Sequence, residues 1–151
     1  MRINSKACTV CKEVQPISGF YKDANKKDGK YSDCKSCHKK KVSAYRRTKE
    51  GLLLKRYNAM KTRVEGKDHN AVSSVGKPIL PKKEFINWAL NNPDFHYLYR
   101  DWVESGYQAK YAPSVDRIDE RFGYELFNMQ FVTHSENSRR AIHFRHYNKI
   151  V

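Results

Sequence analysis

Two Cys-x-x-Cys pairs, Cys8 with Cys11 and Cys34 with Cys37, constrain the fold of this chain more than any other pattern in it. Each pair forms a tight knuckle that turns two sulfurs toward one point, and four thiolates are the ligand set of a tetrahedral zinc site. Such a site has no open coordination position, so we expect the zinc to be structural. His38 directly follows the last cysteine and is an alternative ligand, although we expect an exposed residue that begins the next helix.

The composition indicates a limited hydrophobic core. The 151 residues suffice for one modest domain or two small ones, and only 39% of them are apolar. No run of about 18 apolar residues predicts a membrane span, and the N-terminal residues lack the apolar centre of a signal peptide. We therefore expect a cytoplasmic protein without a membrane partner. Thiols stay reduced in that compartment, which favours metal binding by the cysteines over disulfides.

Positive charge is concentrated in the first half of the chain. The net charge is +14; residues 1–67 carry 19 Lys and Arg against 6 Asp and Glu, whereas residues 68–151 carry 11 against 10. A basic half joined to a balanced half suggests an arm that holds a polyanion and a separate site that acts on it. The alternative is a basic protein whose charge serves only to keep it soluble.

Residues 39–64 are rich in helix formers and lack proline. Leu53, Tyr57, Met60 and Val64 follow the spacing of one apolar helix face, and Gly51 is a candidate break between two helices. The polar side chains of this region form either a solvated linker surface or a surface that contacts phosphates. We expect nucleic acid to be contacted by Lys39, Lys40, Lys41, Arg46, Arg47, Lys55, Arg56 and Arg63 of this region, and by Arg139 and Arg140 further along the chain.

The middle of the chain is predicted to hold a loop and two helices. Residues 65–80 are polar and contain glycine, one helix begins at Pro81, and a second follows Asn92-Pro93 and ends at Gly106. Both tryptophans lie in these helices. We expect them to pack in the core beneath the next segment; the alternative is that they stack on nucleic-acid bases.

Residues 112–141 have the pattern of a hairpin followed by a helix. Short strands are expected at residues 114–118 and 129–133, and a T-x-x-E capping box begins the helix. A hard cation such as Mg2+ requires few protein oxygens because it retains several waters. Asp116 on the first strand and Asn137 on the helix are suitable donors for such an ion, and Asn128 is placed to tie the loop to the first strand.

The run SVDRIDERFGYELFNMQFVTHSEN resembles the HNH endonuclease family, also called the ββα-metal or His-Me finger family, and especially its small phage-encoded members. The resemblance covers residues 80–141 well and the cysteine segment more loosely. It implies that Asp116 and Asn137 bind a catalytic Mg2+ or Mn2+ and that Asn128 is the central asparagine of the motif. A phage-encoded member would act in the cytoplasm of the host cell.

One position departs from that pattern. The family has a general-base histidine after the acidic residue, whereas this chain has Arg117, and a guanidinium does not give up a proton near neutral pH. We expect Arg117 to bind the scissile phosphate. Water activation then requires the metal itself, Asp119 or a histidine that folding brings close, of which His134 is the nearest in sequence.

The sequence thus predicts an α+β protein in three parts: a zinc knuckle over residues 1–38, a basic helical DNA-contacting arm over 39–67, and an HNH-like nuclease domain over 68–151. The predicted activity is metal-dependent cleavage of DNA, by nicking or by cutting both strands. The alternatives are a catalytically degenerate HNH scaffold that only binds DNA, and a zinc-ribbon factor that binds RNA or protein. Monomer and homodimer both remain open.

Overall fold

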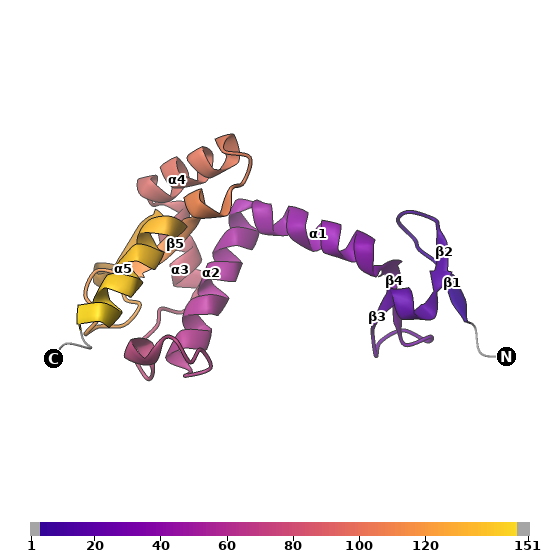
Figure 1. The fold of residues 1–151 in the computed structure, drawn as a ribbon, viewed down its shortest axis with the longest axis horizontal. Coiled ribbons are helices and arrows are strands. Elements are labelled where there is room, and N and C mark those ends of the chain that lie inside the picture. Colours follow the sequence, from indigo (N-terminus) through magenta and orange to yellow (C-terminus); the bar gives the residue numbers. More distant parts are fainter. Residues whose placement is uncertain (1–3, 148–151) are drawn as a thin grey trace. The chain divides into compact units, whose positions relative to one another are not determined.

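The computed structural model describes the backbone of residues 4–147 and the side chains of residues 4–142 (Figure 1). This part of the chain forms five α-helices and three small antiparallel sheets, which confirms the predicted α+β class. The chain divides into two compact units, with the boundary between Thr48 and Lys49. The segment predicted as one basic arm, residues 39–67, is therefore shared between the two units.

The first unit consists of two short hairpins and one helix. Its elements are β1 (Ser5–Ala7), β2 (Val14–Pro16), β3 (Phe20–Lys22), β4 (Lys30–Cys34) and α1 (Lys35–Arg47), with β1 paired to β2 and β3 paired to β4. The first cysteine pair lies in the turn between β1 and β2. The second pair spans the end of β4 and the first turn of α1. The core of this unit is small and consists of Phe20 and three of the cysteines.

His38 is held in place by its neighbours, so the expectation of a plainly exposed residue was wrong. Its ring contacts Tyr21 and Tyr31 edge to face, with centroids 5.3 and 5.0 Å away. Its Nδ1 also lies 3.5 Å from Oδ2 of the buried Asp33. Lys41 lies 3.3 Å from the same carboxylate oxygen. His38 therefore supports the strand that carries Cys34.

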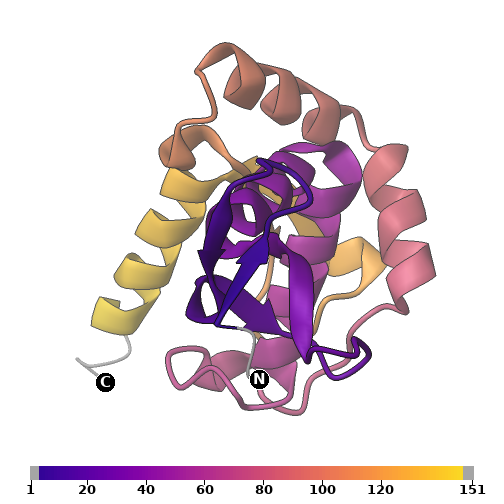
Figure 2. The same cartoon turned by 90° about the vertical axis from the view of Figure 1, so that its right-hand side faces the viewer.

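The second unit packs helices against a hairpin. Its elements are α2 (Lys49–Val64), α3 (Lys82–Leu90), α4 (Pro93–Glu104), β5 (Pro113–Arg117), β6 (Met129–Thr133) and α5 (His134–Tyr147). Figure 2 shows α3, α4 and α5 following one another round the edge of this unit.

The break after α1 lies at Thr48 and not at the predicted Gly51. Thr48 has an extended ψ of 158°, and both its amide and its hydroxyl donate to the carbonyl of Tyr45. These two bonds end α1, because a threonine hydroxyl that binds a nearby backbone carbonyl competes with the hydrogen bonds of the helix. Gly51 instead lies inside α2 and is buried.

The predicted apolar face of α2 is confirmed. Leu53 and Met60 are buried, and Tyr57 and Val64 pack against the same core. The tryptophans are also core residues, as predicted. Trp88 stacks on Phe131 of β6 with ring centroids 4.9 Å apart, and Trp102 is only 7% exposed.

Side-chain caps fix where two helices of this unit, α4 and α5, begin. Asn92 accepts hydrogen bonds from the amides of Asp94 and Phe95, so α4 begins at Pro93. The predicted capping box is present at α5: Oε2 of Glu136 accepts from the amide and the hydroxyl of Thr133, whose Oγ1 in turn accepts from the Glu136 amide. This box places the first turn of α5 directly after β6.

None of the helices in residues 4–147 combines the length and the apolar character that crossing a bilayer requires.

Candidate functional site

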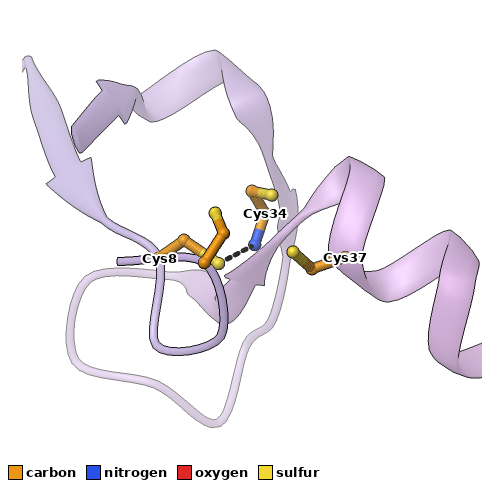
Figure 3. A group of neighbouring side chains, drawn as sticks. Cys8, Cys34 and Cys37 are labelled. Carbon is orange, nitrogen blue, oxygen red and sulfur yellow. Dashed lines mark hydrogen bonds between the residues drawn. The ribbon is translucent and has the colours of Figure 1, made fainter. Parts of the chain in front are cut away.

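The four cysteines of the first unit meet at one point. Their sulfurs all lie within 4.8 Å of one another, and Figure 3 shows Cys8, Cys34 and Cys37 turned toward the same centre. Tetrahedral zinc with bonds of about 2.3 Å to sulfur places its ligands about 3.8 Å apart, so the group is close enough to bind one zinc ion. Among the described residues it is the only group of three or more Cys, His, Asp or Glu that could share an ion.

The electrostatics of the cluster also fit a cation. Burial opposes ionisation of Cys8, but backbone amides, including that of Cys34 at 3.2 Å from Sγ, outweigh it and lower the pKa of Cys8 to about 6. Burial and the neighbouring thiols raise the pKa of Cys37 to about 12. Four thiolates at this spacing repel one another unless a cation neutralises them, which is what bound zinc does.

In the second unit, the hairpin and the helix bring Asp116 and Asn137 to one cleft. β5 and β6 are antiparallel, with Asp116 opposite Gln130, and α5 follows β6 without a linker. The amide nitrogen of Asn137 donates to Ser114 Oγ at 2.7 Å and to the Val115 carbonyl at 3.2 Å. These bonds fix the Asn137 side chain against β5, one residue before the aspartate.

The cleft has a volume of about 880 Å³ and is formed entirely by the second unit. Its walls come from the end of α2, the loop before α3, β5, the β5–β6 loop and α5. Among the described residues, the charged and titratable side chains that line it, besides Asp116, are Arg63, Asp68, His69, Arg117, Glu120, Tyr124 and Arg140. Carboxylate, amide and guanidinium groups thus line the same surface.

Asn128 closes the β5–β6 loop. It is 2% exposed. Its Oδ1 accepts from the amide of Asp119 at 2.8 Å, while its Nδ2 donates to the carbonyls of Asp119 and Gly123, each at 2.9 Å. The backbone amide of Ile118 adds a bond to the Asn128 carbonyl. Asn128 therefore joins the loop to the end of the first strand, as the sequence predicted.

Arg117 is placed differently from the expected phosphate ligand. Its Nη1 donates to the carbonyls of Ser73, Glu120 and Phe122 at 3.1–3.2 Å, and its Nη2 donates to Ser73 Oγ at 2.9 Å. The guanidinium also lies 5.5 Å from the ring centre of Tyr124. Arg117 thus joins β5 to the β5–β6 loop and to the loop before α3.

The guanidinium that lies beside Asp116 belongs to Arg140. Its Nη1 is 2.8 Å from Asp116 Oδ2, which also accepts from Gln130 Nε2 at 3.1 Å. Arg140 is one helical turn beyond Asn137, so both side chains lie on the face of α5 that lines the cleft. Arg139, the adjacent residue, is exposed and does not line the cleft.

Neither of the other two predicted bases is placed in the cleft wall. Asp119 receives three hydrogen bonds from the Arg121 side chain and one from its amide, which lower its pKa and close the turn. Partial desolvation and the charges of Arg56, Lys55 and Arg63 lower the pKa of His134. These three cations all belong to α2.

The predicted nucleic-acid contacts fall into two groups. Lys39, Lys40, Lys41, Arg46 and Arg47 all lie on α1 and are exposed. In the second unit, Arg56 is half-buried and its Nε donates to the Pro113 carbonyl at 2.6 Å, and burial lowers its pKa to about 10. Arg63 contacts Asp68 and the Tyr124 hydroxyl. These two arginines therefore contribute to the fold.

Residues 65–80 were predicted to form a loop, but the prediction did not include the part of that loop in the site, to which it supplies His69 and Ser73. No motif marks these residues, since they lie more than 40 positions before Asp116. The one signal in the sequence was a histidine in a polar loop, and such histidines are common on protein surfaces.

Comparison of the chain with protein-family models, curated proteins and solved structures found no match.

Proposed function

We propose that this chain is a divalent-metal-dependent DNA endonuclease of HNH type. The observation that carries the proposal is that Asp116 and Asn137 line the same cleft. Asp116 lies on the first strand and Asn137 on the helix of a segment that runs strand, strand, helix. The loop that Asn128 closes between the strands supports it, because Asn128 is at the position that the resemblance gives to the central asparagine of the motif.

The donor set suits Mg2+ or Mn2+. One carboxylate and one amide oxygen are hard ligands, and an open cleft leaves room for the waters that such an ion retains. Since β5 engages the amide nitrogen of Asn137, the amide oxygen is the atom left to face an ion. A bound ion would polarise the phosphodiester and stabilise the charge that develops on it.

Arg140 takes the role that the sequence suggested for Arg117. Its side chain is 57% exposed and its guanidinium lies at the aspartate, so a phosphate in the cleft can reach it. Bidentate hydrogen bonding by arginine stabilises a phosphate whose charge grows in the transition state.

The first unit supplies affinity in this proposal. A structural zinc bound by the four cysteines holds the short hairpins together, and the exposed lysines and arginines of α1 contact DNA phosphates. Zinc stabilises small domains whose apolar core is too small to stabilise the fold without it.

Plasmid cleavage tests the proposed activity. Supercoiled plasmid incubated with the full chain and Mg2+ or Mn2+ should be nicked or linearised, and EDTA or Asp116→Asn should stop the reaction. Asp101→Asn is the matched control, since that carboxylate lies exposed on α4 outside the cleft. Intact plasmid with wild type across a series of divalent ions would contradict the proposal.

One observation favours a second candidate, a DNA-binding protein on an HNH scaffold that no longer cleaves. Asp116 already has Arg140 and Gln130 as partners, so its carboxylate is satisfied without a metal ion. This candidate predicts salt-sensitive DNA binding, no cleavage, and a DNA affinity that does not depend on divalent ions.

A further inference from the structure

The cleft lacks a base at the position where the resemblance implies one. A water that attacks phosphorus must lose a proton, and neither Arg117 nor Arg140 accepts one near neutral pH. Among the side chains that the structure describes, those lining the cleft include one histidine, His69, which lies on the loop between α2 and α3.

This loop is fastened to the end of α2. Arg63 Nε lies 3.7 Å from Asp68 Oδ2, and Asp68 Oδ1 accepts from the amide of Asn70 at 3.1 Å. The Gly76 amide donates to the Val64 carbonyl at 2.9 Å, which joins the far side of the loop to the last residue of α2. His69 therefore lies on a backbone whose two sides are both held.

A second attachment comes from the strand that carries the aspartate. Arg117 donates to the carbonyl and to the hydroxyl of Ser73, and it directly follows Asp116 in β5. The residue that stands in place of the expected histidine thus holds the loop that carries His69. Arg117 is a positioning residue, because it acts on the cleft through this loop.

The His69 side chain is accessible. The residue is exposed, and its ring makes no hydrogen bond or ion pair with another residue of the described part of the chain. His96 differs, since its two ring nitrogens contact Lys49 and the Leu90 carbonyl. His38 differs too, since it lies against Asp33 and two tyrosines.

We propose that His69 is the general base of the phosphodiester hydrolysis proposed above, and this inference rests on that function. The imidazole takes a proton from the attacking water while the water oxygen bonds to phosphorus. The bond from phosphorus to one ester oxygen breaks, and that oxygen takes up a proton from solvent. The products are a phosphomonoester and an alcohol, and the imidazolium returns its proton to solvent.

Glu120 is the competing residue in the same cleft. Its Oε2 is buried and has no hydrogen-bond partner among the described residues. Because that oxygen is buried, a water in the open cleft has less access to it than to the exposed His69. An imidazole is also a stronger proton acceptor than a carboxylate near neutral pH, which favours the histidine.

The test compares His69→Ala, His69→Gln, Glu120→Gln and His134→Ala in the full chain. Plasmid cleavage at saturating Mg2+ should fall about 100-fold or more in both His69 variants, which is the usual range for loss of a general base. DNA affinity should stay within about twofold of wild type, since one neutral side chain adds little to phosphate binding. Added imidazole should restore part of the activity of His69→Ala.

A readout independent of cleavage uses the uncut complex. In Asp116→Asn, a bound DNA duplex should protect His69 from modification by diethyl pyrocarbonate, because the duplex covers the cleft. Peptide mapping by mass spectrometry identifies the modified histidine. Unchanged modification of His69 with bound duplex would overturn the placement of the substrate beside it.

The remaining outcomes separate the two proposals. If wild type cleaves in an Asp116-dependent manner and His69→Ala cleaves equally well, His69 is not the base and the endonuclease function stands. The base is likewise misassigned if Glu120→Gln or His134→Ala shows the large loss instead. A His69→Ala loss that follows DNA affinity and is not restored by imidazole would make it a binding residue. If wild type does not cleave, both proposals fail.

Discussion

Arg140 of α5 and Asp116 of β5 form an ion pair with 2.8 Å between Nη1 and Oδ2, on the surface of the cleft that also holds Asn137. The aspartate side chain is only 14% exposed, whereas that of the arginine is 57% exposed. A divalent cation bound at Asp116, as proposed above, would therefore compete with the guanidinium of Arg140 for one carboxylate. Binding of that cation would release Arg140 toward solvent, where a phosphate could replace the carboxylate.

Arg140→Gln should separate these two roles. Removal of a partly exposed ion pair changes the binding free energy by up to about 1 kcal/mol, so the Kd for Mn2+ without DNA should tighten by up to about fivefold. Plasmid cleavage should nevertheless fall, because the phosphate loses its cationic partner. Calorimetry measures the first effect and a cleavage assay the second. Arg139→Gln controls for net charge, and an equal gain in Mn2+ affinity there would contradict competition at Asp116.

Arg117→His should lower cleavage, although it restores the residue type that the resemblance implies. An imidazole cannot replace the four hydrogen bonds by which the guanidinium holds Ser73, Glu120 and Phe122. The loop that carries His69 should open more often. Amide hydrogen exchange of residues 68–76 should quicken in this variant. Arg121→His, which alters a guanidinium that pairs only with Asp119 among the described residues, should leave that exchange unchanged. A gain of cleavage in Arg117→His would show that the arginine limits an otherwise intact site.

Local patterns in the sequence predicted much of the fold. The apolar face of α2, the start of α4 at Asn92-Pro93 and the capping box at Thr133 all depend on residues close in the chain, and each Cys-x-x-Cys pair is itself a local motif. Asn128 was predictable for the same reason, since its partners lie within nine or ten positions. Helix and hairpin signals of this kind need no knowledge of tertiary packing.

The tertiary contacts of the cleft were not predictable in this way. Arg117 was assigned to phosphate because it replaces the histidine that the resemblance implies and cannot act as a base, yet its partner Ser73 lies 44 positions earlier. Arg140 was assigned to the nucleic-acid surface, although folding pairs it with Asp116, 24 positions away. An arginine side chain is long enough to reach several acceptors, and the tertiary fold decides which of them it binds. The sequence pattern therefore indicated which residues are polar, but not which of them contact one another.

Acid should remove the contribution of the α5 capping box to stability. Hydrogen bonds from Thr133 hold the pKa of Glu136 below its ordinary value of 4.5. A depressed folded-state pKa means that this carboxylate stabilises the fold above about pH 4.5 and that the contribution is lost as the pH falls through the folded pKa.

Glu136→Ala should accordingly lower the free energy of unfolding at pH 7 by about 1 kcal/mol, the usual size of a capping interaction. The difference from wild type should shrink at pH 3. Both tryptophans lie in the second unit, so urea titrations followed by tryptophan fluorescence report this unit alone. An equal difference at both pH values would show that the charge of Glu136 is irrelevant.

Zinc removal should unfold the first unit and leave the second folded. The first unit has a core of one phenylalanine and three cysteines, which is too small to stabilise a folded domain without the metal. A strong chelator, or Cys34→Ser, should collapse the NMR amide signals of residues 5–47 while those of residues 50–142 persist. Excess zinc should restore the chelated wild type. Retained dispersion of the first unit's signals without metal would contradict a structural zinc site.

The basic face of α1 should set the salt dependence of DNA binding. Each phosphate contact contributes about 0.9 to the slope of log affinity against log salt concentration. Lys40→Ala with Arg47→Ala should therefore lower the magnitude of that slope by about 1.8, while the Kd for Mn2+ at Asp116 stays the same. Fluorescence anisotropy with a labelled duplex over a range of salt concentrations measures the slope. Lys83→Ala with Lys82→Ala on α3 removes the same charge from the other unit and controls for net charge. If both double variants lower the slope equally, the effect is one of total charge, and α1 does not contact the phosphates.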